Sequence, residues 1–151
     1  MIDLNLHTFQ EKLNVKSVDN KTFIWCTIRK KYLVLQPEEV VRQLMILHLL
    51  EQGYPIEKIQ VEKSFDVNGM IKRFDIVVYD RNIKPHLIVE CKAHHHKLNQ
   101  SVHDQIIVYN LSLDAHYFVL TNGISSICYE RRENEMIELD KFPEYLSLIH
   151  I

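Results

Sequence analysis

The stretch "RFDIVVYDRNIKPHLIVECKA", residues 73–93, decides the fold. Two apolar runs rich in valine and isoleucine flank "RNIKP", a short segment of the kind that forms turns. Because strands joined by a short turn pair with each other, the stretch predicts an antiparallel hairpin. The start of the first run then faces the end of the second. We therefore expect Asp75 near the register of Glu90.

Three polar side chains of this hairpin are candidates for chemistry. Alternate residues of a strand share a face, so Glu90 and Lys92 are expected on one face and Cys91 on the other. Asp75 stands in an apolar strand, where an aspartate must be solvated at a cleft, paired or metal-bound. The two carboxylates and Lys92 are thus predicted to converge, and oxygen clusters of this kind bind hard divalent cations. Taken singly, an aspartate or a Glu-x-Lys pair in a strand more often serves a solvated face or an ion pair than a catalytic role.

The segments before the hairpin predict further elements. "IQVEKSF" and the turn "DVNG", residues 59–69, add a third strand, so that residues 59–93 form an antiparallel meander. "QPEEVVRQLMILHLLEQGYP", residues 36–55, predicts a helix that starts at Pro37 and ends at Gly53. "TFIWCTIRKKYLVL", residues 22–35, is rich in β-branched and aromatic residues and predicts one strand, or two interrupted by "RKK".

The segments after the hairpin complete the pattern. Residues 99–115 have apolar residues at mostly helical spacing and predict a second helix. "HYFVLTNG" and "ISSICYE", residues 116–130, predict two strands around Asn122-Gly123, a strong hairpin-turn dipeptide. The order is strand, helix, three strands, helix, two strands. This order indicates an α/β fold, a mixed β-sheet core flanked by helices.

Composition limits the class of protein. The chain has 151 residues, 46% of them hydrophobic, which suffices for a single domain over residues 1–151. Its formal net charge of -2 indicates that any basic surface is local. The three cysteines are an odd number without CxxC spacing, which argues against disulfides and a four-ligand zinc site. No apolar stretch is long enough to span a membrane, so we expect a soluble protein in a reducing cytoplasm.

The three consecutive histidines of "ECKAHHHKLNQ" raise the alternative of a histidine metal site. Adjacent residues point in divergent directions on any regular backbone, whereas metal ligands are spaced to converge. We therefore expect His94–His96 to form an exposed turn and leave the chemistry to Glu90 and Lys92.

The arrangement of Asp75 and Glu90-x-Lys92 resembles the D…(D/E)xK signature of the PD-(D/E)XK nuclease superfamily, with Phe74 where the name-giving proline stands. The resemblance extends to "RKKYLVLQPEEVVRQ", "GYP", "NGMIKRFDIVVYD", "LIVECKA", "DQIIVYN" and "YFVLTNG". Together these segments resemble the N-terminal nuclease domain of type I restriction enzyme R (HsdR) subunits. The similarity covers roughly residues 29–123. One departure is "ECKAHHH", where relatives usually have a proline after the alanine.

The resemblance implies a restriction-endonuclease-like core and assigns roles by motif. Asp75 and Glu90 become ligands of Mg²⁺, or of Mn²⁺, and Lys92 becomes the catalytic lysine. Glu39 of "PEEVVRQ" becomes the helix-borne acid, although Glu38 competes for that role and an acid here also suits the positive end of the helix dipole.

A further implied element lies in "QIIVY". Gln105 and Tyr109 resemble the QxxxY element of RecB-like nucleases. Residues i and i+4 share a helix face, so both could reach one cleft. Tyr109 could instead belong to the core.

Basic residues provide a candidate DNA surface, with a solvated face as the alternative for each of them. Together with Tyr109, the candidates are Arg29, Lys30, Lys31, Lys72 and Arg73, and Lys97 lies on the far rim.

The predicted function is Mg²⁺-dependent hydrolysis of DNA by an endonuclease or exonuclease domain, and the alternative is a non-catalytic nucleic-acid-binding or assembly module. The chain contains no GxxxxGK[ST] loop, so we expect it not to translocate DNA by itself. Restriction-modification subunits or a motor protein are the expected partners beside DNA.

Overall fold

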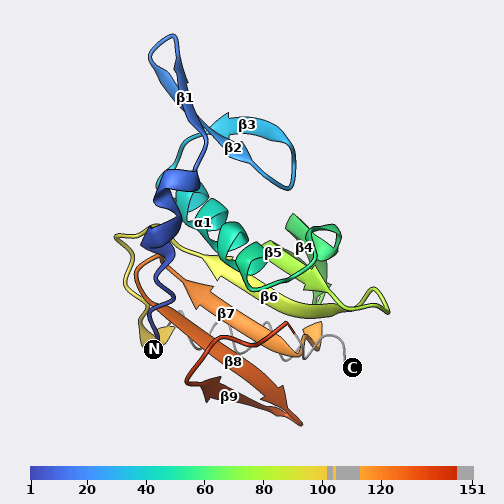
Figure 1. The fold of residues 1–151 in the computed structure, drawn as a ribbon. Helices are drawn as coiled ribbons and strands as arrows, with labels where there is room; N and C mark the ends of the chain where they lie inside the picture. Colours follow the sequence, from blue (N-terminus) through green and yellow to red (C-terminus); the bar gives the residue numbers. More distant parts are fainter. Residues whose placement is uncertain (102–103, 105–112, 146–151) are drawn as a thin grey trace.

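Two β-sheets and a long helix organise the chain in the computed structural model, which describes residues 1–101, 104 and 113–145 (Figure 1). The larger sheet has six strands in the order β4-β5-β6-β7-β8-β9. Its strands are β4 (Ile59–Val67), β5 (Met70–Tyr79), β6 (Pro85–Cys91), β7 (Tyr117–Thr121), β8 (Ser126–Arg132) and β9 (Glu135–Leu139). The smaller sheet is formed by β1 (Val15–Val18), β2 (Lys21–Cys26) and β3 (Lys31–Val34).

The six-stranded sheet is mixed, as the order of elements predicts. β6 and β7 are parallel, and all other neighbours in this sheet are antiparallel. The meander β4-β5-β6 and the hairpin of β7 and β8 around Asn122-Gly123 are confirmed. Gly123 has a φ of 88°, and a Cβ there would approach Val41 of the facing helix to 3.2 Å. The turn thus needs glycine for its backbone and for its packing.

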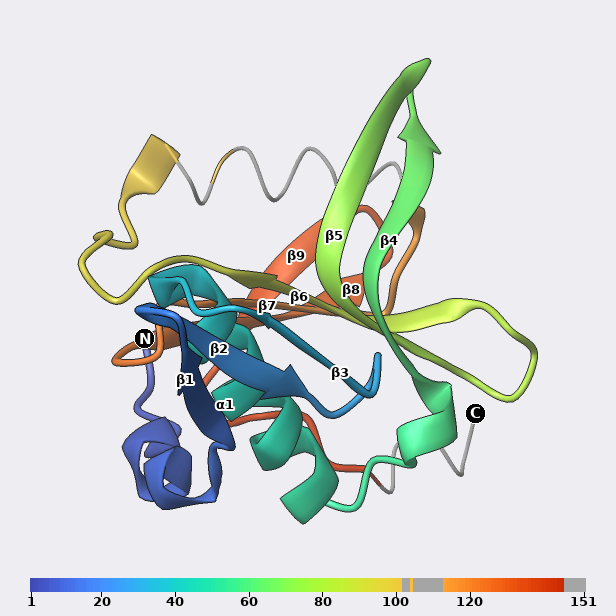
Figure 2. The same cartoon turned by 90° about the horizontal axis from the view of Figure 1, so that it is seen from above.

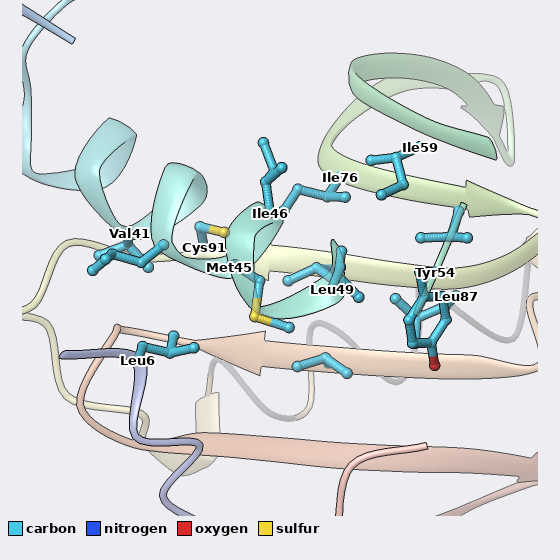
Figure 3. Packing of buried hydrophobic residues seen from close by; sticks show 14 of the residues in the cluster. Leu6, Val41, Met45, Ile46, Leu49, Tyr54, Ile59, Ile76, Leu87 and Cys91 are labelled. Atoms are coloured by element: carbon cyan, nitrogen blue, oxygen red, sulfur yellow. The ribbon is translucent and has the colours of Figure 1, made fainter. Parts of the chain in front are cut away.

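Helix α1 (Pro37–Glu51) lies against one face of this sheet (Figure 3). Pro37 occupies its first turn with two acidic residues, as predicted. Its buried side packs Val41, Met45 and Leu49 against apolar residues of β5, β6 and β7. Short 3-10 helices precede the two sheets, η1 (Leu6–Lys12) and η2 (Ile56–Lys58). No helix in the described residues is long and apolar enough to cross a membrane.

The opposite face of the sheet carries a second apolar cluster. It contains Phe74 and Val77 of β5, Ile88 of β6 and Phe118 of β7, all fully buried. The central strands are therefore buried on both faces, which explains why their sequences are continuous apolar runs rather than alternating ones. This two-sided burial holds the strands that carry the candidate site.

The edges of the fold decide what the sequence left open or did not predict. Of the two alternatives for residues 22–35, the two-strand one is confirmed: β2 and β3 are separated by a turn over residues 27–30. Strands β1 and β9 were not predicted, because β1 is exposed along its whole length and β9 is only half-buried. The helix predicted over residues 99–115 lies mostly outside the described residues.

The long hairpin of β4 and β5 bends out of the sheet (Figure 2). Its ladder pairs Val61 with Ile76 and Lys63 with Phe74, but Glu62 and Asp75 between them do not pair. Glu62 has a φ of 51°, in the left-handed region that non-glycine residues seldom adopt. The sheet is thus interrupted at the level of Asp75.

Burial of His86 predicts a loss of stability in acid. His86 is 2% exposed and stacks on His116, and burial, followed by the charge of His116, lowers its pKa to about 4, with Asp80 acting in the opposite direction. The unfolded chain, with a pKa near 6.5, binds this proton more readily. The contribution is therefore complete above about pH 6.5 and is lost as the pH falls towards 4, at most about 3 kcal/mol.

The variant His86→Leu removes this titration. Urea unfolding across the same pH range should show a shallower fall in the free energy of unfolding for His86→Leu than for the wild type. Replacement of the exposed His95 by leucine is the matched control and should follow the wild type. Parallel pH profiles for the wild type and His86→Leu would contradict the assignment.

Candidate metal and phosphate site

The candidate site lies where β5 and β6 stop pairing, which we call the strand fork. The ladder pairs Ile76 with Val89, so Asp75 and Glu90 come next and face each other in register, as predicted. Beyond that level the two strands no longer pair, and a side chain takes the place of a backbone partner. The Cys91 backbone N–H donates a hydrogen bond of 2.7 Å to Oδ2 of Asp75. The two carboxylates thus stand at the point where the strands separate.

Glu90 is a buried carboxyl group that the protein only partly satisfies. Glu90 is 7% exposed, and its Oε1 has no hydrogen-bond partner in the described part of the chain. Burial, followed by the charge of Asp75, raises the pKa of Glu90 to about 7. Lys72, with its Nζ 4.0 Å from Oε2, Lys92 and the Asp75 backbone N–H act against this rise. Near neutral pH, Glu90 is therefore partly protonated and partly ionised.

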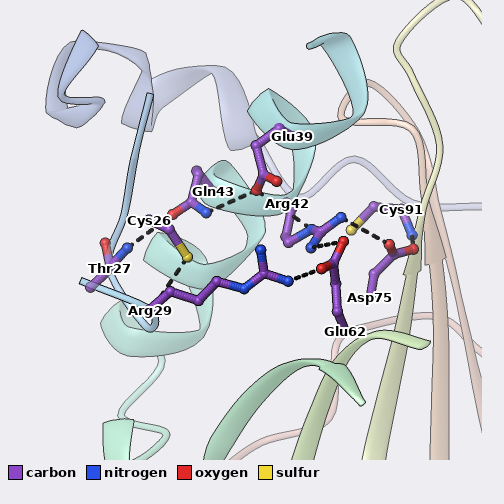
Figure 4. Close-up of polar contacts among 9 residues, drawn as sticks. All are labelled: Cys26, Thr27, Arg29, Glu39, Arg42, Gln43, Glu62, Asp75 and Cys91. Atoms are coloured by element: carbon purple, nitrogen blue, oxygen red, sulfur yellow. Dashed lines mark hydrogen bonds and ion pairs between the residues drawn. The ribbon is translucent and has the colours of Figure 1, made fainter. Parts of the chain in front are cut away.

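Asp75 is held from two sides. Oδ2 accepts the Cys91 N–H, and Oδ1 accepts a hydrogen bond of 3.3 Å from Nη2 of Arg42 on α1 (Figure 4). Burial raises the pKa of Asp75, while the hydrogen bond from Cys91 and the charge of Arg42 lower it. Lys92 also lowers it. The cation of α1 and the backbone of β6 therefore fix both oxygens of this carboxylate.

Side-chain direction at the fork follows the predicted alternation in β6. Cys91 packs with Val89 in the cluster beneath α1, so Glu90 belongs to the other face. Asp75 turns towards α1, where it meets Arg42. Lys92 follows the end of β6 and lowers the pKa of both carboxyl groups, so its ammonium lies within electrostatic reach of each. That both carboxylates hold one ion stays a prediction.

The two candidate helix acids have different surroundings. Glu39 is buried, and its Oε2 accepts a hydrogen bond of 3.0 Å from Gln43 and lies 3.5 Å from Nε of Arg42. Glu38 is exposed at the helix start, yet its charge is among those that raise the pKa of Asp75. Glu38 therefore acts on the site through its field, and Glu39 through its contact with Arg42.

A polar pocket of about 300 Å³ lies beside these acids. Its lining residues come from the β2–β3 region, α1 and β4, and they are Arg29, Leu33, Val34, Gln36, Glu38, Glu39, Arg42 and Glu62. The Arg29 guanidinium forms an ion pair with Glu62, so this predicted DNA contact already has an acidic partner. Lys30, Lys31 and Arg73 are exposed, and Lys72 is half-buried beside Glu90.

The histidines are confirmed as an exposed turn. His94–His96 follow Ala93 directly, and the carbonyl of His96 accepts a hydrogen bond of 2.8 Å from Asn122. Within the described residues, no group of three or more histidine, cysteine, aspartate or glutamate side chains is placed to hold a metal ion. Gln105 and Tyr109 lie outside the described residues, so their predicted roles stay predictions.

Arg42 is the residue of this site that sequence reasoning missed. It is the third residue of "VVRQ", lies among the buried apolar residues Val41, Met45 and Ile46 of the helix, and is only 5% exposed. An arginine amid positions with helical apolar spacing is the signal that could have identified it, because a charge on that face needs buried partners.

Comparison with known families adds a second line of evidence. Residues 37–143 match the family model described as "Type I restriction enzyme R protein N terminus". The chain belongs to this family. The match includes α1, the strand fork and the six-stranded sheet.

A solved structure supports the fold. The fragment structure of a putative HsdR subunit of a type I restriction enzyme from Vibrio vulnificus YJ016 superposes with a TM-score of 0.58 at 22% sequence identity. The similarity covers 76% of this chain and 25% of that chain, so the matched part spans only a quarter of that chain's length. A search of curated proteins found no match.

Glu90 provides a direct test of the site's electrostatics. In protein free of divalent ions, we expect its carboxyl group to titrate near pH 7 in ¹³C NMR. Asp75→Asn should lower this pKa, because a neighbouring negative charge is removed, and Lys72→Met should raise it, because a positive charge is removed. The exposed Lys97 offers a control, Lys97→Met, which should leave it unchanged. A Glu90 pKa near 4.5 in the wild type would contradict this view of the fork.

Proposed function

We propose that the protein is a Mg²⁺-dependent DNA nuclease domain that hydrolyses phosphodiester bonds at the strand fork. The observation that carries the proposal is the pair of buried carboxyl groups, Asp75 and Glu90, with Lys92 in reach of both. Burying two acids within electrostatic reach of each other is costly unless a cation or proton compensates. Membership of the restriction enzyme R family supports a DNA substrate.

The residues at the fork fit a hard divalent cation. Both donors are oxygen atoms, and Oε1 of Glu90 is a buried acceptor without a hydrogen-bond partner among the described residues. Mg²⁺ is commonly held by one or two carboxylates together with water and phosphate oxygens, so two carboxylates suffice. Asp75 and Glu90 are the residues that would hold it, and Mn²⁺ suits the same donors. When bound, such an ion supplies charge neutralisation and a more acidic water molecule.

The lysines provide the protein's own contribution to the reaction. Lys92 can donate to a phosphate oxygen or orient the attacking water, because its ammonium lies within reach of both carboxylates. Lys72 is 4.0 Å from Glu90 and can balance the carboxylate when it loses its proton. Glu38 adds negative field from the helix start, which increases the demand for a cation at Asp75.

DNA approaches over the exposed cations in this proposal. Lys30 and Lys31 lie at the β2–β3 turn, and Arg73 lies on β5 two residues before Asp75. These side chains can contact phosphates on either side of the fork. Because the chain matches a quarter of the larger HsdR fragment, restriction-modification subunits or a motor protein are the partners that would deliver DNA to it.

One observation favours a second candidate, a non-catalytic nucleic-acid-binding or assembly module. Both oxygens of Asp75 already accept hydrogen bonds, from Arg42 and from Cys91. In such a module the ion pair of Asp75 with Arg42 would be structural. The exposed cations Lys30, Lys31 and Arg73 would then bind nucleic acid without catalysis.

Cleavage assays separate the two candidates. Plasmid and single-stranded DNA should be cut with Mg²⁺ or Mn²⁺, and Lys92→Ala should slow cleavage by on the order of 100-fold, because it removes a donor to the developing charge. Replacing His94, His95 and His96 together with alanine is the control and should leave the rate largely intact. Equal rates for the wild type and Lys92→Ala would exclude a catalytic lysine at this position.

Binding of DNA provides a test that does not depend on cleavage. Ca²⁺ should strengthen DNA binding by the wild type, because a cation at the fork relieves repulsion between the carboxylates and a phosphate. Asp75→Asn should bind DNA better than the wild type without divalent ions, for the same reason. Titrations at fixed ionic strength are required, because salt alone weakens phosphate contacts. Affinity that responds neither to Ca²⁺ nor to Asp75→Asn would support the binding module instead.

A further inference from the structure

Arg42 connects three elements that meet beneath the strand fork. Its guanidinium, carried by α1, lies 3.5 Å from Glu39 of the same helix, 3.1 Å from Glu62 of β4 and 3.3 Å from Asp75 of β5 (Figure 4). The side chain is 6% exposed. One buried cation therefore faces three carboxylates, of which one is a proposed metal ligand.

The three contacts are not equivalent. Nη2 donates a hydrogen bond to Oδ1 of Asp75, whereas Nε and Nη1 have no hydrogen-bond partner in the described part of the chain and meet Glu39 and Glu62 only as ion pairs. Hydrogen bonds constrain direction, and ion pairs constrain mainly distance. The directional contact of Arg42 is thus the one that orients Asp75.

Glu62 explains how Arg42 reaches this position. Its backbone is in the left-handed region at the level where the β4–β5 ladder is interrupted, and its carboxylate pairs with both Arg42 and Arg29. Residues in such conformations persist only where their surroundings hold them. Both arginines pair with the Glu62 carboxylate, and the interruption leaves Asp75 outside the ladder, where it contacts Arg42 of α1.

We propose that Arg42 is a positioning residue for the metal ligand Asp75. It holds Oδ1 while the Cys91 N–H holds Oδ2, so the carboxylate is presented to a divalent ion in one orientation. This inference rests on the proposed metal site at the fork. Partners that orient a ligating carboxylate typically contribute 10- to 100-fold to metal affinity.

The sign of the effect distinguishes positioning from simple charge. Arg42 is a cation beside a cation site, so its field alone opposes metal binding. If field were its whole role, Arg42→Met would bind metal more tightly. If Arg42 positions Asp75, the same substitution loosens the carboxylate and weakens binding despite the removed repulsion.

The experiment is a calorimetric titration of the whole protein with Mn²⁺, and with Ca²⁺ as a second cation. Arg42→Met is compared with Arg29→Met, which also removes an arginine from Glu62, although Arg29 forms no hydrogen bond or ion pair with Asp75 among the described residues. Arg42→Lys retains the charge and loses the planar donor pair. Thermal unfolding without metal reports the stability of each variant separately.

We expect Arg42→Met to weaken Mn²⁺ binding 10- to 100-fold, Arg42→Lys to weaken it in the same direction, and Arg29→Met to bind as the wild type even though it is less stable. Unchanged or tighter binding by Arg42→Met, or an equal loss in Arg29→Met, would overturn the inference. If Arg42→Met does not fold, Arg42→Lys and the double variant Arg42→Met with Glu62→Gln decide by the same criterion. A wild type that binds neither cation would instead refute the proposed metal site itself.

Discussion

The candidate site depends on one interruption in backbone pairing. Between Val61 and Lys63 in β4, and between Phe74 and Ile76 in β5, the antiparallel ladder loses a level. At the same level, Asp75, β5 also ceases to pair with β6. Backbone groups that lose their ladder partners must be satisfied in another way, because unpaired buried N–H and carbonyl groups are costly. The Asp75 carboxylate satisfies the Cys91 N–H. The break that frees the Asp75 carboxylate thus also creates a donor for it.

Much of this arrangement could be predicted from local pattern. The apolar runs of residues 73–93 sufficed for two strands and their register, because a short turn leaves little choice of pairing, and the helix start at Pro37 followed from its chemistry. The exposed turn at His94–His96 followed from the divergence of adjacent side chains. These features are encoded by residues close together in the chain.

The remainder required tertiary contacts. Nothing in "IQVEKSF" indicates that Glu62 adopts a positive φ. The partners of its carboxylate, Arg42 and Arg29, lie 20 and 33 residues before it in the chain. The choice between Glu38 and Glu39 depends on how α1 is rotated against the sheet, which periodicity specifies only to within a residue. Here Glu39 turns inward to Arg42, whereas Glu38 stays exposed.

The charged side chains at the fork form two groups, one around Arg42 and one around Glu90, and Asp75 interacts with both. On the α1 side, Glu39, Glu62 and Asp75 all pair with the buried Arg42, and Glu62 also pairs with Arg29, so two arginines offset most of the charge of three carboxylates within the fold. On the other side, Glu90 has a lysine at 4.0 Å and one unpartnered oxygen in the described contacts, and burial raises its pKa to about 7. Of the two facing carboxyls, Glu90 is therefore the one that takes up a proton when no other cation compensates it. A divalent ion at the fork would have to displace that proton, so metal affinity would fall as the pH drops below about 7, while the ion pairs of Arg42 keep Asp75 in place.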